Sequence, residues 1–286
     1  MAKMLSPAIF EYIARNTHSG VYVIDREQKI VFWNSGAERI TGYLQQEMLG
    51  RTCQDNLLIH CDKEGILLCG DGCPAEAAMK DGRIVDACVL THHKQGHRIP
   101  ILVRAIPLRD EKGAVVGAAA CFDRQAIPEV SGATENETFL PLDENTGLPD
   151  KDFSYTFLAA KLRRLTPDSR RFTVVRFEMA ELENLRKSLG KEAIPAILKP
   201  LAETLKAAIR PPDYLGMWNN AGFLMVLGTG RDNPPEITSL RYKNLAEATS
   251  ISWWGDRLIP ITNVKATIAQ AGDTVESLIA RLNKMP

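Results

Sequence analysis

The chain has 286 residues, which is enough for about two ordinary domains that each bury a core of their own. Its 35 Lys and Arg residues balance 35 Asp and Glu residues, and no basic run stands out. The charge pattern therefore excludes an obvious surface for nucleic acid or an anionic membrane. The longest apolar stretch, near 113–122, is too short to span a bilayer, and the first residues lack a signal-peptide pattern. These features predict a cytoplasmic protein without a membrane span.

The first 124 residues alternate apolar and polar positions in short runs that are separated by turns. The expected elements are a helix over 7–15, a hairpin over 20–25 and 30–33, a short helix over 37–41, and strands over 84–92, 98–108 and 114–123. Asn34 and the pair Gly42–Tyr43 flank the short helix. This order resembles a PAS sensory domain, which implies an antiparallel sheet with short helices. The resemblance leaves the sensed ligand open, because such a fold hosts many cofactors or none.

A cluster of thiols and imidazoles distinguishes this half of the chain. Its members are Cys53, His60, Cys61, Cys69, Cys73, His92 and His93. Thiolates and imidazoles suit zinc or iron, and a glycine-rich turn lies between Cys69 and Cys73. We therefore expect a zinc or iron centre held by Cys53, Cys69 and Cys73, with Cys61 or His92 as the fourth ligand. Buried thiols that only pack a core remain the alternative, since the spacing is not diagnostic.

Two further cysteines, Cys88 and Cys121, fall within expected strands, and we expect them to be core residues. A disulfide scaffold is not expected, because six cysteines are too few for a chain of this size.

The composition changes between the two halves of the chain. Pro, Ser, Gly, Thr and Asn lie among acidic residues from about 124 to 142, without a helical or strand period. We therefore expect a first domain over 1–124, a linker over 125–142 and a second domain over 143–286.

The second half alternates helical and strand patterns, which is typical of α/β and α+β architectures. The expected elements are helices over 153–165, 182–189, 193–210 and 235–249, a strand over 171–177, a hairpin that turns at 219–220, and strands near 251–254 and 261–266. The segment Thr146-Gly147-Leu148-Pro149 and this hairpin are similar to the opening motif and the signature hairpin of the GGDEF (diguanylate cyclase) family. The resemblance spans 142–284 and implies a sheet flanked by helices. Family members join two GTP molecules into c-di-GMP.

The resemblance also implies that catalysis is lost. The family signature, Gly-Gly-Asp/Glu-Glu-Phe, falls on Asn219, Asn220, Ala221, Gly222 and Phe223, so only the Phe is kept. The two metal-binding aspartates fall on Glu178 and Ala180, and the guanine-reading positions fall on Arg186, Ile194 and Pro195. Metal ions neutralise phosphate charge in such a reaction, so we expect no cyclase activity. Asn tolerates left-handed backbone angles, so we expect the turn itself to persist, with Phe223 in the core.

A product-binding site is expected nevertheless. Arg210 and Asp213 match the Arg-x-x-Asp pair at which family members bind c-di-GMP, and Arg241 falls where members supply a further arginine. A guanidinium can grip guanine or phosphate in a bidentate manner, and a carboxylate can accept from the N–H groups of guanine. We therefore expect a PAS sensor coupled to an inactive GGDEF domain that binds c-di-GMP.

Two alternatives remain for the second domain. It could bind no nucleotide and transmit the state of the first domain by homodimerising or by docking on an unidentified output protein. It could also bind GTP without turnover, but the residues at the guanine-reading positions, Arg186, Ile194 and Pro195, disfavour this.

Overall fold

The computed structural model describes residues 6–52, 55, 57–69, 72–125, 141–180, 182–190, 192–228, 234–253, 256–260 and 262–285. The chain divides into two compact units, Met1–Ala126 and Ile127–Pro286. The linker expected over 125–142 falls mostly outside the described residues. Over the described ranges, no helix has both the length and the apolar character that crossing a membrane requires.

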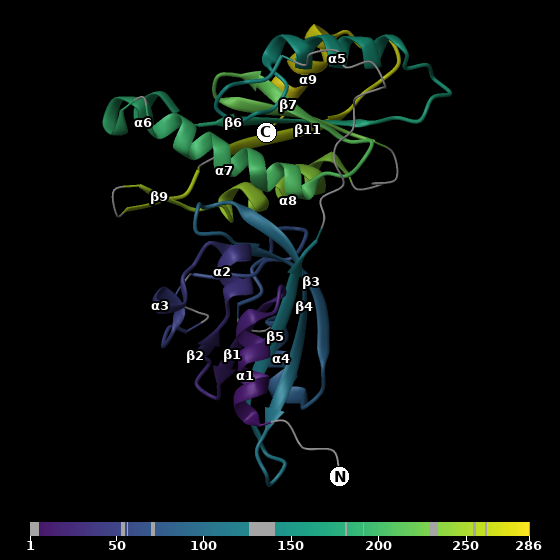
Figure 1. Cartoon of the computed structure of the whole chain (residues 1–286). Coiled ribbons are helices and arrows are strands. Elements are labelled where there is room, and N and C mark those ends of the chain that lie inside the picture. The colour runs from purple at the N-terminus through teal and green to yellow at the C-terminus, as the bar shows by residue number, and fades with distance from the viewer. Residues whose placement is uncertain are drawn as a thin grey trace. The chain divides into compact units, whose positions relative to one another are not determined.

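The first unit is built on a five-stranded antiparallel sheet in the order β2-β1-β5-β4-β3 (Figure 1). Its strands are β1 (Gly20–Asp25), β2 (Ile30–Trp33), β3 (Val85–His92), β4 (Arg98–Arg109) and β5 (Val115–Arg124). Its helices are α1 (Pro7–Asn16), α2 (Ser35–Thr41), α3 (Gln45–Met48) and α4 (Pro74–Asp81). The strand predictions are confirmed to within one residue at either end. Helix α3 was not anticipated from the sequence.

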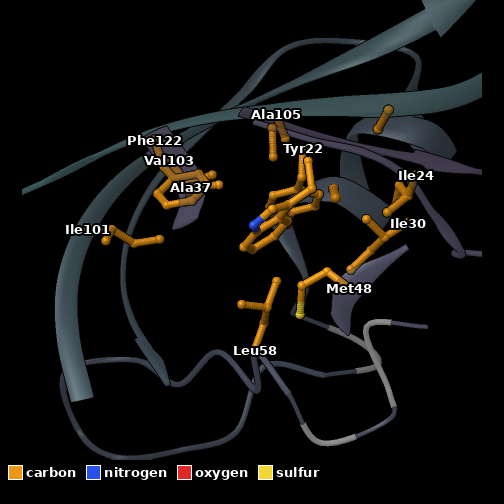
Figure 2. Close-up of a cluster of buried hydrophobic side chains, with 14 of the residues drawn as sticks. Tyr22, Ile24, Ile30, Ala37, Met48, Leu58, Ile101, Val103, Ala105 and Phe122 are labelled. Atoms are coloured by element: carbon orange, nitrogen blue, oxygen red, sulfur yellow. The ribbon is translucent and has the colours of Figure 1, made fainter. Parts of the chain in front are cut away.

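The core of this unit lies on one face of the sheet, around the fully buried Trp33. Figure 2 shows side chains of β1, β4 and β5 turned toward Met48 and Leu58, which lie on the segments that cover this face. Alternate residues of β1 are buried, because successive side chains of a strand point to opposite faces. Each large apolar side chain that is fully buried in this way contributes about 1.5–3 kcal/mol.

Asn34 joins three elements of the first unit. Its Oδ1 accepts hydrogen bonds from the backbone amides of Val21 and Ala37, at 2.8 Å each, and thereby caps α2 and fixes the start of β1. Its Nδ2 donates to the carbonyl oxygens of Ala14 and Ser19, at 2.9 and 3.0 Å. The side chain is 2% exposed, so these bonds replace water for groups that are themselves removed from solvent.

Replacing this asparagine is expected to destabilise the first unit. Asn34→Ala leaves the amides of Val21 and Ala37 without their side-chain acceptor, and each unsatisfied buried group costs about 1–3 kcal/mol. We expect a loss of about 3 kcal/mol, measured by urea unfolding. Asn16→Ala is the control, because Asn16 is exposed and its amide donates to Tyr12 O on the surface, so its loss should stay within about 0.5 kcal/mol. Equal losses for the two variants would contradict this role of Asn34.

The prediction that Cys88 and Cys121 are core residues was wrong. Cys88 is exposed and its Sγ donates to Gln125 Oε1 at 2.9 Å, while Cys121 is half-buried. Their cross-strand partners on β4 are Leu102 and Arg104, which are exposed as well. The register therefore turns both thiols to the sheet face opposite the core.

The second unit holds a four-stranded antiparallel sheet in the order β11-β6-β8-β7 and a separate β9–β10 pair. Its strands are β6 (Thr173–Met179), β7 (Tyr214–Asn219), β8 (Gly222–Leu227), β9 (Ile251–Trp253), β10 (Asp256–Leu258) and β11 (Thr262–Ile268). Its helices are α5 (Lys151–Arg163), α6 (Leu182–Leu189), α7 (Ala193–Ala208), α8 (Pro235–Glu247) and α9 (Val275–Asn283). Figure 1 shows α5 and α9 on one face of the four-stranded sheet and α7 and α8 on the other.

Both faces of this sheet are covered, so all six residues of β8 are buried, including the fully buried Phe223 that the sequence placed in the core. Helix α7 ends at Ala208, two residues before the end expected from the sequence. Ile209 is already extended, and Arg210 precedes Pro211, a position at which helical backbone angles are disfavoured. Helix α9 and strand β10 were not anticipated.

Candidate functional site

The turn from Arg210 to Asp213 connects α7 to β7. Asp213 is 3% exposed, and its carboxylate accepts from the backbone amides of Arg210, at 3.2 Å, and Gly228, at 2.8 Å. The Asp213 amide donates to Arg210 O at 2.6 Å, and the Pro211–Pro212 peptide within the turn is cis. Asp213 thus braces the turn and ties it to the end of β8, while Arg210 is exposed on its surface.

Cationic and aromatic groups lie beside this turn. Burial lowers the pKa of Lys161, and the negative charge of Asp213 opposes that shift, so the two groups are within electrostatic reach. Tyr214, the residue after Asp213, stacks on Phe157 with ring centroids 4.0 Å apart. Its hydroxyl is 2.9 Å from Ser154 Oγ. The start of β7 is therefore anchored firmly to α5.

Arg241 lies on α8, as the sequence predicted, and is half-buried. Its guanidinium carbon lies 5.2 Å from the ring centroid of Tyr242. Tyr242 is fully buried and packs edge-on against Phe177 of β6, with ring centroids 6.0 Å apart. A ring in the core thus positions this third residue of the predicted site.

The hairpin predicted to replace the cyclase signature lies at the opposite end of the β7–β8 pair. Strand β7 has six residues, so roughly 20 Å separates this hairpin from the Arg210 turn at ~3.3 Å per residue. Asn219 Oδ1 accepts from the Ala221 amide at 2.8 Å, and Met179 N donates to Ala221 O at 3.1 Å. The turn persists, as expected. It needs no left-handed backbone at its asparagines, because Gln28 is the single non-glycine residue with positive φ in the described ranges. The side-chain bond of Asn219, rather than left-handed backbone, therefore shapes it.

Gly222 occupies a closed position in this hairpin. It pairs with Glu178 across β8 and β6, and a Cβ at Gly222 would lie 2.2 Å from Phe177 O. Such a distance is far below van der Waals contact, so a side chain at this position requires the two strands to separate.

Glu178 of β6, the acidic residue that pairs with Gly222 beside the hairpin, forms an ion pair. Its Oε2 lies 3.1 Å from Nη2 of Arg176, two residues earlier on the same face of β6. The Arg176 side chain is 9% exposed and that of Glu178 is 39% exposed. Ala180 is exposed at the end of β6 and offers no ligand atom. A metal ion at Glu178 would therefore have to compete with a nearly buried guanidinium.

The positions aligned with guanine recognition carry different chemistry. Arg186 is exposed on α6, and Ile194 and Pro195 are half-buried in the first turn of α7. An isoleucine and a proline offer no side-chain hydrogen bond to a base.

The thiol cluster of the first unit is only partly gathered. Cys61 is buried, Cys73 is half-buried and Cys69 is exposed; the charge of Cys69 affects the pKa of both other thiols, so the three lie in one neighbourhood. Cys53 lies outside the described residues. Across the residues that the structure describes, no three His, Cys, Asp or Glu side chains are grouped so as to hold a metal ion.

Local chemistry also disfavours ligation in the described part of the cluster. Burial raises the pKa of the Cys61 thiol to about 11, against the opposing charge of Arg98, so the thiolate that a metal needs is disfavoured. His92 is 6% exposed, and its Nδ1 lies 2.9 Å from the Tyr43 hydroxyl. These contacts do not fit the expected zinc or iron site, which stays a prediction.

The buried cation Arg98 was not anticipated from the sequence; it is 1% exposed and donates through Nη1 to Ile59 O. Nothing in the local sequence indicates that this arginine is buried, because it is the first residue of β4, and polar residues are common at strand ends. Next to Ile59, burial lowers the pKa of His60 to about 4, and the charge of Arg98 adds to that effect.

The lowered pKa of His60 predicts a pH dependence of folding. The unfolded chain binds this proton near pH 6.5 and the folded chain only near pH 4. The stability contributed by neutral His60 is therefore fully present above about pH 6.5 and is lost as the pH falls toward 4, by up to ~3 kcal/mol. Urea unfolding of the full chain between pH 7 and 4.5 measures how the free energy of unfolding changes with pH, and His60→Gln should reduce that change. The same pH dependence in the wild type and the variant would contradict this role of His60.

A group of cations on and after α5 was not anticipated either. Lys161, Arg164 and Arg170 line one pocket together with Phe157 and Phe172. The signal was present in the sequence, because five Lys and Arg residues fall between 161 and 171.

The comparisons with known proteins agree with this architecture. A PAS domain model matches residues 18–124, and a model described as diguanylate cyclase, GGDEF domain, matches residues 141–284. No curated protein matches the chain.

Several solved structures are similar to parts of the chain. A sensory box/GGDEF family protein from Caulobacter crescentus CB15 is 21% identical, with a TM-score of 0.44, over 50% of this chain and 92% of that one. The PAS domain of a protein from Colwellia psychrerythraea is 20% identical, with a TM-score of 0.35, over 41% and 95%. The GGDEF domain of DgcB from Caulobacter crescentus, in complex with c-di-GMP, is 9% identical, with a TM-score of 0.42, over 53% and 88%. By the match over 141–284, which covers about half of its length, the chain belongs to the diguanylate cyclase GGDEF domain family, and a PAS domain over 18–124 precedes its GGDEF domain.

Proposed function

We propose that this PAS–GGDEF signalling protein does not synthesise c-di-GMP but binds it, at the turn that carries Arg210 and Asp213. The observation that carries the proposal is the contrast between the two ends of β7. At one end an exposed arginine is presented on a turn braced by a buried carboxylate. At the other end the surviving acidic residue, Glu178, is paired with Arg176.

The bracing of the turn supports binding. A turn that is already ordered loses little conformational freedom when a ligand arrives, so more of the interaction energy appears as affinity. The Asp213 carboxylate accepts from Arg210 N and Gly228 N and so holds the turn that presents Arg210. Carboxylates accept from guanine N1–H and N2–H, and the Arg210 guanidinium has the donors for guanine O6, N7 or phosphate.

The charge around the turn also suits a dianionic ligand. Lys161 lies within electrostatic reach of Asp213. The family resemblance suggests Arg241 of α8 as a further cation, from the same or a second subunit. Charge-assisted hydrogen bonds to phosphate are roughly twice as strong as neutral ones, so each such cation adds affinity for a cyclic dinucleotide.

A calorimetric titration of the full chain with c-di-GMP tests the proposal. We expect binding at micromolar concentrations and weaker binding of the adenine analogue c-di-AMP, because adenine lacks the N1–H donor that a carboxylate accepts. Asp213→Asn should narrow this preference, since an amide offers a donor as well as an acceptor, and it still provides an oxygen for Gly228 N. Absence of c-di-GMP binding at tens of micromolar would overturn the proposal.

A rival function is supported by a different observation. Ile237 and Leu240 of α8 are 51% and 58% exposed; Ile237 lies one turn before Arg241 and Leu240 directly precedes it. Exposed apolar side chains on a helix are typical of surfaces that dock a partner, so a protein that fails the titration would instead act as an interaction module.

A further inference from the structure

A pocket of about 480 Å³ opens on the second unit beside the end of α5. Its lining residues are Phe157, Ala160, Lys161, Arg164, Leu165, Ser169, Arg170 and Phe172. The volume falls within the range of sites that hold small organic ligands. Neither the signature hairpin nor the residues of the Arg210 turn contribute to this lining.

The lining combines an apolar floor with a cationic rim. Leu165 and Phe172 are buried, Phe157 and Ala160 are half-buried, and Arg164 and Arg170 are exposed. Lys161 lies between the aromatic rings, with Nζ 5.6 Å from the centroid of Phe157 and 5.4 Å from that of Phe172. None of the described residues that line the pocket is acidic. The site therefore favours an anion that also carries an apolar or aromatic body.

The walls of the pocket are held in place without a ligand. Thr166 N donates to Ser169 Oγ and Ser169 N donates to Thr166 O, each at 3.0 Å, which closes the turn after α5. Phe157 is fixed by its stacking on Tyr214. A ligand would thus meet a largely preformed site, and the ordering cost of binding would be small.

We propose that this pocket binds an aromatic anion the size of a single nucleotide, with its phosphate on Arg164 and Arg170 and its ring over the apolar floor. Guanidinium groups match the geometry of phosphate oxygens and also stack on planar bases, so the two arginines suit both parts of the ligand. Phe157, Ala160 and Leu165 would remove one face of the ring from water. Lys161 lines this pocket and also lies within electrostatic reach of Asp213, but no residue of the Arg210 turn lines the pocket, so the proposal requires no c-di-GMP binding at that turn.

The test uses GMP as the probe, titrated into the full chain by calorimetry. We expect GMP to bind, and Arg164→Ala and Arg170→Ala each to lower its affinity at least tenfold through loss of charge-assisted bonds. Arg163→Ala is the matched control: Arg163 is exposed on α5 next to Arg164 but does not line the pocket, so affinity should not change. Because all three arginines are exposed, the variants should fold, which their circular dichroism verifies.

Three further arms separate the sources of binding. Ribose 5-phosphate, which lacks the ring, and guanosine, which lacks the phosphate, should each bind at least tenfold more weakly than GMP. Arg210→Ala should bind GMP as the wild type does, so that this proposal and the c-di-GMP proposal can fail independently. The pocket proposal is overturned if GMP does not bind at millimolar concentration, if Arg164→Ala binds it normally, or if ribose 5-phosphate binds equally well. It is also overturned if Arg164→Ala weakens the binding of c-di-GMP while the wild-type protein does not bind GMP, because Arg164 would then belong to the c-di-GMP site.

Discussion

Purified protein supplied with GTP and magnesium or manganese is expected to form no c-di-GMP above a reaction without protein. The attack of a ribose hydroxyl on an α-phosphate requires metal ions to offset phosphate charge, which contributes several kcal/mol to such transition states. Glu178 is held by Arg176, and neither Ala180 nor Gly222 can supply a second ligand. A loss of about 4 kcal/mol alone slows a reaction roughly a thousandfold. Chromatography of the nucleotides after overnight incubation measures the product.

A family cyclase with an intact signature, assayed in the same buffer, is the positive control. Arg176→Ala is an informative variant, because it releases Glu178 from its ion pair without restoring a second carboxylate. We expect this variant to remain inactive as well. Formation of c-di-GMP by the wild-type protein under these conditions would show that the domain is a working cyclase.

Arg210→Ala is expected to lower the affinity for c-di-GMP at least tenfold. Arg210 is exposed at the turn, and its guanidinium would donate charge-assisted hydrogen bonds to the ligand that are worth roughly 1.5–3 kcal/mol each. The backbone amide of Arg210, which bonds to Asp213, remains in the alanine variant, so the turn should keep its shape. Calorimetry or the displacement of a fluorescent c-di-GMP analogue measures the change.

Two control variants accompany this measurement. Arg163→Ala removes an exposed arginine from the same unit, and Glu178→Gln alters the opposite end of the sheet, so neither should change the affinity more than about twofold. If Arg210→Ala binds c-di-GMP as tightly as the wild type, the ligand lies elsewhere and the assignment of this turn fails.

Much of the fold could be predicted from the sequence, because local signals agree with the tertiary structure. The strands of the first unit follow the two-residue alternation of apolar side chains, and their limits differ from the predicted ones by no more than a residue. Arg210 and Asp213 could be selected as a candidate site because their spacing matches the Arg-x-x-Asp pair of the family, and the structure places them in the turn between α7 and β7. Helix α9 was missed although Thr274 caps it, since its short apolar stripe follows a turn closely.

The features that escaped prediction depend on register and on distant packing. No local pattern shows that Arg176 pairs with Glu178, because the pairing depends on which face of β6 is buried. The exposure of Cys88 follows from the same cause. The pocket at the end of α5 needs Phe157 and Phe172 brought together with three cations, and only the folded chain does this.

Gly222 sets a steric limit on the residues that this position of the hairpin accepts. Since a Cβ there would lie 2.2 Å from Phe177 O, a change of this glycine to glutamate would push β8 from β6. Such overpacking typically costs 1–3 kcal/mol or more, a large part of the stability margin of a small domain. A glutamate at position 222 is therefore expected to destabilise the second unit unless β6 and β8 also change. The absence of synthesis that we propose would accordingly not be reversed by one substitution at this position.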